Sequence, residues 1–139
     1  DDLIEAIHGE VHAVFVHVFG EEYDPRRSVN ENFRSIFTGL TKLFIDRPAE
    51  TKFMEQYYNS PYGVEKKRAE EIECDRPLAE FFDQGRRQKI IKDLPFPILF
   101  GLSFGPILML VRDHFNGFVD LNDATIATVI GACWDAVKA

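Results

Sequence analysis

The amino-acid sequence predicts an all-α domain, a helical bundle of about six helices. Apolar side chains recur at steps of three and four residues along most of the chain, which is the period of a helix with one buried face. No segment shows the alternation of apolar and polar residues that indicates a strand. The length of 139 residues is that of one domain, and a hydrophobic content of 45% provides enough apolar side chains for a core.

Two amphipathic helices are expected in the first third of the chain. Residues 2–19 carry one apolar stripe, and Gly20 indicates that this helix ends there. The second helix begins at Ser28, because Ser28 and Glu31 have the spacing of a capping box, in which each side chain bonds a free backbone N–H. Its apolar stripe stops before Pro48.

The middle of the chain predicts two further helices and a charged connection. A helix over residues 48–59 begins at a proline, which suits the first turn, and "NSPYG" at 59–63 predicts a turn. The run "VEKKRAEEIECDRP" at 64–77 indicates a solvated helix face. In residues 78–88, two phenylalanines are expected to face inward. A last helix is expected to begin at a cap formed by Asn122 or Asp123.

An apolar run, "LPFPILFGLSFGPILMLV", occupies residues 94–111 without one ionisable side chain. A membrane span needs roughly 20 apolar residues, so this run is a borderline candidate. Pro106 would lie in mid-helix and kink it, and the other helices are amphipathic as in a soluble bundle. These features favour a helix over about 95–115 that is covered by protein on all sides.

Small residues on the last two helices indicate how such a helix would be covered. Gly101 and Gly105 leave one stripe without side chains, and the final helix carries a similar small-residue face. We therefore expect the last two helices to form a four-helix interface in a homodimer. The expected interface residues are Gly101, Gly105, Ile107, Leu108, Phe115, Ala127, Gly131 and Trp134.

Chemistry-bearing motifs are scarce. The sequence contains no glycine-rich phosphate loop, no GxSxG and no HExxH, so no enzyme activity, catalytic residue or cofactor is expected. His8 and His12 have an i, i+4 spacing that suits a metal, but no third ligand is evident, which favours packing over a metal site.

The net charge of −7 makes the domain a poor partner for a phosphate backbone. Cys74 and Cys133 have no paired spacing and are expected to be reduced thiols.

Aromatic and large apolar residues on successive helices have two interpretations. They form either a packed core or the lining of an apolar cavity, because both use the same residue types. The cavity interpretation predicts a ligand site made of Phe33, Phe37, Phe53, Tyr57, Phe81, Leu102 and Met109.

Four stretches, taken in order, resemble a known family. They are "DDLIEAIHGEV", "FTGLTKLFIDRPAETKFMEQYY", "PLAEFFDQGRRQKIIKDLP" and "NDATIATVIGACWDAV". Their order and spacing are similar to the C-terminal ligand-binding and dimerisation domain of TetR/AcrR-type bacterial transcriptional regulators. One departure is that Arg86–Arg87 and Lys89–Ile90 replace the family's usual small residues.

The resemblance implies that residues 1–139 form a single ligand-binding and dimerisation domain of a cytoplasmic regulator that does not enter the membrane. A helix-turn-helix domain would precede Asp1, and DNA would be bound only through it. A small apolar ligand would shift the first helix and so control DNA release. The alternatives are a standalone all-α small-molecule carrier, or a metal-dependent enzyme using His8, His12 and a carboxylate.

Overall fold

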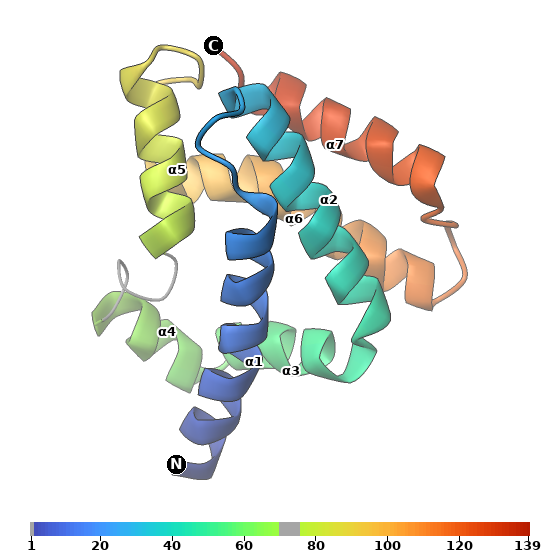
Figure 1. Ribbon diagram of the computed structural model, residues 1–139. Coiled ribbons are helices and arrows are strands. Elements are labelled where there is room, and N and C mark those ends of the chain that lie inside the picture. The colour runs from blue at the N-terminus through green and yellow to red at the C-terminus, as the bar shows by residue number, and fades with distance from the viewer. Residues whose placement is uncertain (1, 70–75) are drawn as a thin grey trace.

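The computed structural model confirms an all-α fold and describes residues 2–69 and 76–139 (Figure 1). These ranges contain seven helices and no strand; one isolated antiparallel bridge pairs Ile91 with Lys138. The helices are α1 (Asp2–Glu22), α2 (Val29–Asp46), α3 (Pro48–Tyr58), α4 (Pro61–Ala69), α5 (Arg76–Arg87), α6 (Phe96–Phe115) and α7 (Asp123–Val137).

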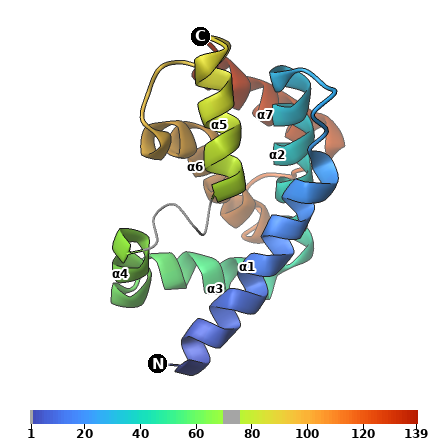
Figure 2. The ribbon, with the colours of Figure 1, turned by 60° about the vertical axis from the view of Figure 1, so that its left-hand side comes forward.

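The helices form two groups, one at each end of the domain, and α1 runs between them. In both views α3 and α4 lie at the end near the N-terminus, while α5, α6 and α7 lie at the other end (Figures 1 and 2). α2 packs against α1, α3, α6 and α7, and therefore contacts elements from both ends.

The buried face of α2 forms the centre of the core. The predicted capping box is confirmed: Glu31 N–H donates to Ser28 Oγ at 3.1 Å, and Ser28 N–H donates to Glu31 Oε1 at 3.4 Å. Further along, Phe33 and Phe37 are fully buried, with ring centroids 4.4 Å apart. Phe33 lies 5.2 Å from the ring of Trp134 on α7, so the first half of α2 is closely covered by aromatic packing.

One predicted helix limit was wrong, and one predicted turn is shorter than expected. α1 continues past Gly20 to Glu22, whose carboxylate accepts a hydrogen bond from the Ser35 hydroxyl at 2.6 Å, so the additional turn is anchored on α2. The turn predicted at 59–63 is confined to residues 59–60, because Pro61 starts α4. A proline suits the first turn of a helix as well as it suits a turn. Of the charged run, residues 70–75, with Cys74, lie outside the described residues.

α1 is covered less than its apolar stripe predicted. Leu3 is 67% exposed and Ile7 is 38% exposed, and the fully covered positions of α1 are His8 and Val11. The first turns of α1 extend beyond the rest of the bundle (Figure 1), which explains their exposure.

α6 runs unbroken through Pro106, with Pro95 at its N-cap. One side of it is buried in the core through Leu99, Ser103, Phe104, Ile107 and Val111. Other sides are open, and Met109 is 63% exposed. By length and composition α6 is the one candidate for a membrane span among the described helices, which is weak evidence because the core helix of a soluble protein has the same character.

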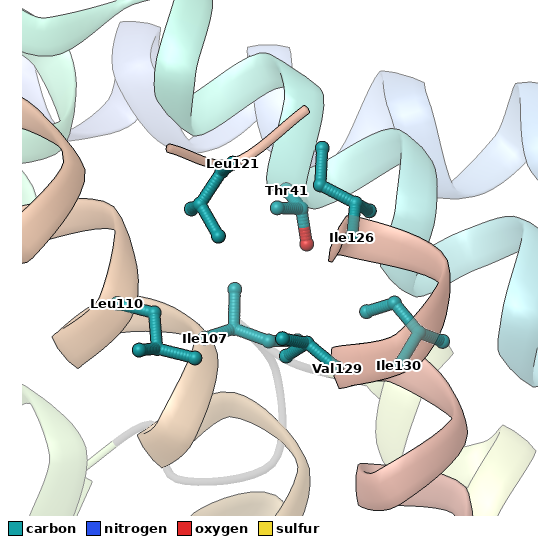
Figure 3. Close-up of a pocket in the computed structure, with 7 residues that line it drawn as sticks. All are labelled: Thr41, Ile107, Leu110, Leu121, Ile126, Val129 and Ile130. Atoms are coloured by element: carbon teal, nitrogen blue, oxygen red, sulfur yellow. The ribbon is translucent and has the colours of Figure 1, made fainter. Parts of the chain in front are cut away.

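α6, α7 and α2 meet in a closely packed junction (Figure 3). Seven side chains converge there, and the space between them is too small for a water molecule. They are Thr41, Ile107, Leu110, Leu121, Ile126, Val129 and Ile130. The junction therefore stabilises the α6–α7 pair and offers no room for a ligand.

The turn that follows α5 contains a left-handed residue. Ile90 and Ile91 N–H groups donate to the Gly85 carbonyl at 3.0 and 3.1 Å, and Lys89 has a φ of 59° to close this turn. A side chain in this conformation costs free energy because its Cβ approaches the carbonyl oxygen, and glycine avoids that cost.

Lys89→Gly should therefore stabilise the domain by about 0.5–1 kcal/mol, measured by urea unfolding. The matched control is Gln88→Gly at the neighbouring exposed position, which lacks a positive φ and should lose stability through added backbone entropy. A Lys89→Gly variant less stable than the native chain would contradict the assignment of strain to this residue.

Candidate functional site

A cavity of about 550 Å³ lies between α1, α2, α3, α5 and α6. Its volume is in the range of small-molecule sites, which is roughly 300–1,000 Å³. α1 contributes Phe15, Val16 and Phe19 to the wall, and α6 contributes its whole side from Phe96 to Arg112. The cavity thus adjoins both the helix that starts the chain and the most apolar helix of the fold.

Aromatic rings form a large part of the described wall of this cavity. Several of them contact one another: Phe15 and Phe44 meet edge to face at 5.1 Å, and Phe100 and Phe104 stack at 4.6 Å. These contacts fix the rings, so the wall is formed in the absence of a ligand. The seven wall rings are Phe15, Phe19, Phe44, Tyr58, Phe96, Phe100 and Phe104.

Few polar side chains reach the cavity wall, and two of them carry opposite charges. Glu55 on α3 and Arg112 on α6 form an ion pair between Oε1 and Nη2. The glutamate side chain is 33% exposed and the arginine side chain 58% exposed. Thr51 also lines the wall, but its hydroxyl donates to the carbonyls of Phe44 and Arg47 at 3.0 and 2.8 Å and is used within the fold.

α1 is joined to α3 by an aromatic and hydrogen-bonded contact next to the cavity. The buried His8 ring stacks on Tyr57 at 4.1 Å, and its Nε2 lies 3.2 Å from the Tyr58 hydroxyl. The Tyr57 hydroxyl lies 3.0 and 3.2 Å from the two carboxylate oxygens of Glu5, to which it donates. α1 is therefore connected to the same short helix that carries Glu55.

Of the ligand residues predicted from the sequence, Met109 lines the cavity. Phe33, Phe37 and Phe81 lie in the packed core instead, where neighbouring rings fill the space around them. Tyr57 is buried against His8, Phe53 is half-buried with its ring 6.0 Å from Tyr57, and Leu102 packs on the core from outside.

The sequence prediction missed most of the cavity wall. Phe96, Phe100 and Phe104 follow one another at steps of four, so they share one side of α6. This spacing is a signal that could have identified them. Phe15 and Phe19 on α1 have the same spacing and face the same cavity.

The residues predicted for the dimer interface have three different environments. Gly101, Gly105, Leu108 and Ala127 are exposed, while Phe115 and Gly131 are partly covered. Ile107 and Trp134 are 1% and 6% exposed and belong to the core of the chain itself, because they face α2 and the α6–α7 junction. Gly105 and Leu108 also line the cavity.

Metal-ligating and nucleophilic groups are sparse in the part of the chain that the structure describes. It contains no group of three or more His, Cys, Asp or Glu side chains that could hold a metal ion. The rings of His8 and His12 stack at 5.7 Å. Cys133 is buried in the core, and this burial raises the pKa of its thiol, which keeps it in the unreactive protonated form.

Comparisons with known proteins agree with this architecture. Residues 28–138 match the family model described as Tetracyclin repressor-like, C-terminal domain. A TetR family transcription regulator from Marinobacter aquaeolei VT8 has a similar structure, with a TM-score of 0.86 and 24% identity over 98% of this chain and 71% of that one. A TetR-family transcriptional regulator from Haemophilus influenzae RD gives a TM-score of 0.82 and 22% identity over 100% of this chain and 73% of that one. No curated protein matches the sequence significantly.

Tyr57→Phe should destabilise the domain by about 1 kcal/mol in urea unfolding, because the Glu5 carboxylate loses the tyrosine hydroxyl as a donor. Tyr62→Phe makes the same chemical change on an exposed tyrosine and should change stability little. Equal effects of the two substitutions would show that the contact of Tyr57 with Glu5 does not tie α1 to α3.

Proposed function

Because the chain belongs to the Tetracyclin repressor-like C-terminal domain family, we propose that it is the ligand-sensing and dimerisation domain of a cytoplasmic bacterial transcriptional regulator. One observation carries the proposal: a ready-formed apolar cavity of about 550 Å³ has the helix nearest the N-terminus as part of its wall. A ligand in this cavity would contact α1 directly.

The proposed response to ligand is a shift of α1. A ligand changes a conformational equilibrium only by binding one state more tightly than the other, and couplings of about 1–3 kcal/mol are typical. Phe15, Val16 and Phe19 would contact the ligand, while Glu5 and His8 contact α3. α1 would therefore transmit the change toward the N-terminus.

DNA contact is proposed to belong to the helix-turn-helix domain that the family resemblance places before Asp1. The described domain itself suits this division of roles, because a net charge of −7 repels phosphate groups. The domain would therefore control DNA binding without contacting DNA.

A homodimer through α6 and α7 is the second part of the proposal. Ile98 on α6 is 49% exposed, and on α7 the small residues Ala124, Ala127 and Thr128 lie on one exposed stripe. Small residues allow helices of two chains to approach closely, and an apolar side chain such as Ile98 gains free energy when covered. The two helices would thus form a four-helix interface.

The ligand proposal is tested with Nile red, a neutral apolar dye whose fluorescence rises in an apolar site. The native chain should bind it saturably. Gly105→Leu should weaken binding by about tenfold, since the new side chain occupies part of the cavity. A Cβ meets no atom within 4 Å at either Gly105 or Gly9, so Gly9→Leu, on an exposed part of α1 outside the cavity, is the matched control. Absence of saturable dye binding by the native chain would refute the proposal.

The dimer proposal is tested by light scattering after size exclusion. The native chain should be a dimer, and Ala127→Arg should raise the dissociation constant at least about tenfold by placing charges in an apolar interface. Ala13→Arg, at an exposed alanine of α1, should leave the dimer intact. A native monomer at micromolar concentration would overturn this part of the proposal.

A further inference from the structure

The ion pair on the cavity wall gives information about the chemical class of ligand. Glu55 and Arg112 come from different helices and meet at the wall of a cavity whose other lining is mainly aromatic and aliphatic. Among the described wall residues they are the only two whose ordinary pKa values make them charged at neutral pH; His12 and Tyr58 are the other two ionisable residues of the wall. A charged ligand group would therefore have to exchange with one partner of this pair.

An anionic ligand group that takes the place of Glu55 beside Arg112 is unfavourable. An anion bound to Arg112 would leave the Glu55 carboxylate without its cation and next to a second negative charge. Glu55 is the more enclosed partner, with 33% of its side chain exposed, so it recovers less solvation from water.

A cationic ligand group that takes the place of Arg112 beside Glu55 is favourable for the opposite reasons. A cation bound to Glu55 releases Arg112, whose side chain is already 58% exposed and long enough to be solvated. The wall contains seven aromatic rings, and the face of an aromatic ring attracts a cation within about 6 Å of its centroid. The carboxylate keeps a positive partner throughout the exchange.

Resting on the proposed ligand-sensing function, we propose that the cavity binds a bulky apolar cation, with Glu55 as its counter-ion and Arg112 as the group that it displaces. The exchange also has a mechanical consequence. The Glu55–Arg112 pair joins α3 to α6, and Tyr57 joins α3 to α1. Displacement of Arg112 frees α3 from α6 and leaves it attached to α1, which couples the charge of the ligand to the position of α1.

The test compares tetraphenylphosphonium with tetraphenylborate, two ions of the same shape and opposite charge, by titration calorimetry on the native chain. Tetraphenylphosphonium should bind at least about tenfold more tightly. Glu55→Gln should weaken its binding by about tenfold, and Arg112→Gln should strengthen it by removing the competing cation. Glu50→Gln is the matched control, since Glu50 lies on the same helix outside the cavity, and it should change nothing.

Nile red separates the failure of this inference from the failure of the proposed function. Both Glu55→Gln and Arg112→Gln should retain dye binding, which shows that the cavity is folded. Dye binding together with tighter binding of tetraphenylborate, or with no effect of Glu55→Gln, overturns the cation assignment and leaves the sensing function intact. Absence of binding of the dye and of both ions refutes both proposals.

Discussion

The structure depends on how the apolar surface of α6 is covered. A helix with almost no polar face is stable in water only when protein or ligand covers its apolar sides. Ile107 and Val111 are covered by the core, Phe100 faces the cavity, and Ile98 is left half exposed. Complete burial of a side chain of that size contributes about 1.5–3 kcal/mol, and about half of this surface remains to be covered at Ile98. The helix that closes the core therefore also provides the surfaces on which we propose that a ligand and a second chain bind.

α3 connects these surfaces to α1 although it has only eleven residues. Glu55 pairs with Arg112 on α6, and two positions later Tyr57 contacts Glu5 and His8 on α1. Residues two apart on a helix point in different directions, so one short rigid element serves two neighbours. A change in the Glu55 pair would be transmitted to α1 through α3 without passing through the packed junction of α2, α6 and α7.

The fold follows from local signals, whereas the cavity follows from packing between distant helices. Helical periodicity and the Ser28–Glu31 capping box act within a few residues, and the structure confirms both. Phe37 and Phe44 lie on the same stripe of α2, and no local signal separates their roles. Phe37 is enclosed by Phe104 and Phe82, while Phe44 is near the end of α2, where the cavity begins. That difference depends on the point at which α3 turns away from α2. The spacing of residues in the sequence does not specify this point.

Thiol labelling of three variants, each with one introduced cysteine, tests this division of α6 most directly. In a Cys74→Ser background that keeps the buried Cys133, Ser103→Cys reports the core, Leu108→Cys the cavity and Ile98→Cys the uncovered side. A water-soluble maleimide should label the first variant slowly under all native conditions. It should label the second rapidly until Nile red is added, and the third rapidly only when the protein is diluted below the dissociation constant of the dimer. Equal labelling of the second and third variants, insensitive to both dye and dilution, would contradict the division of α6 into a core side, a cavity side and an interface side.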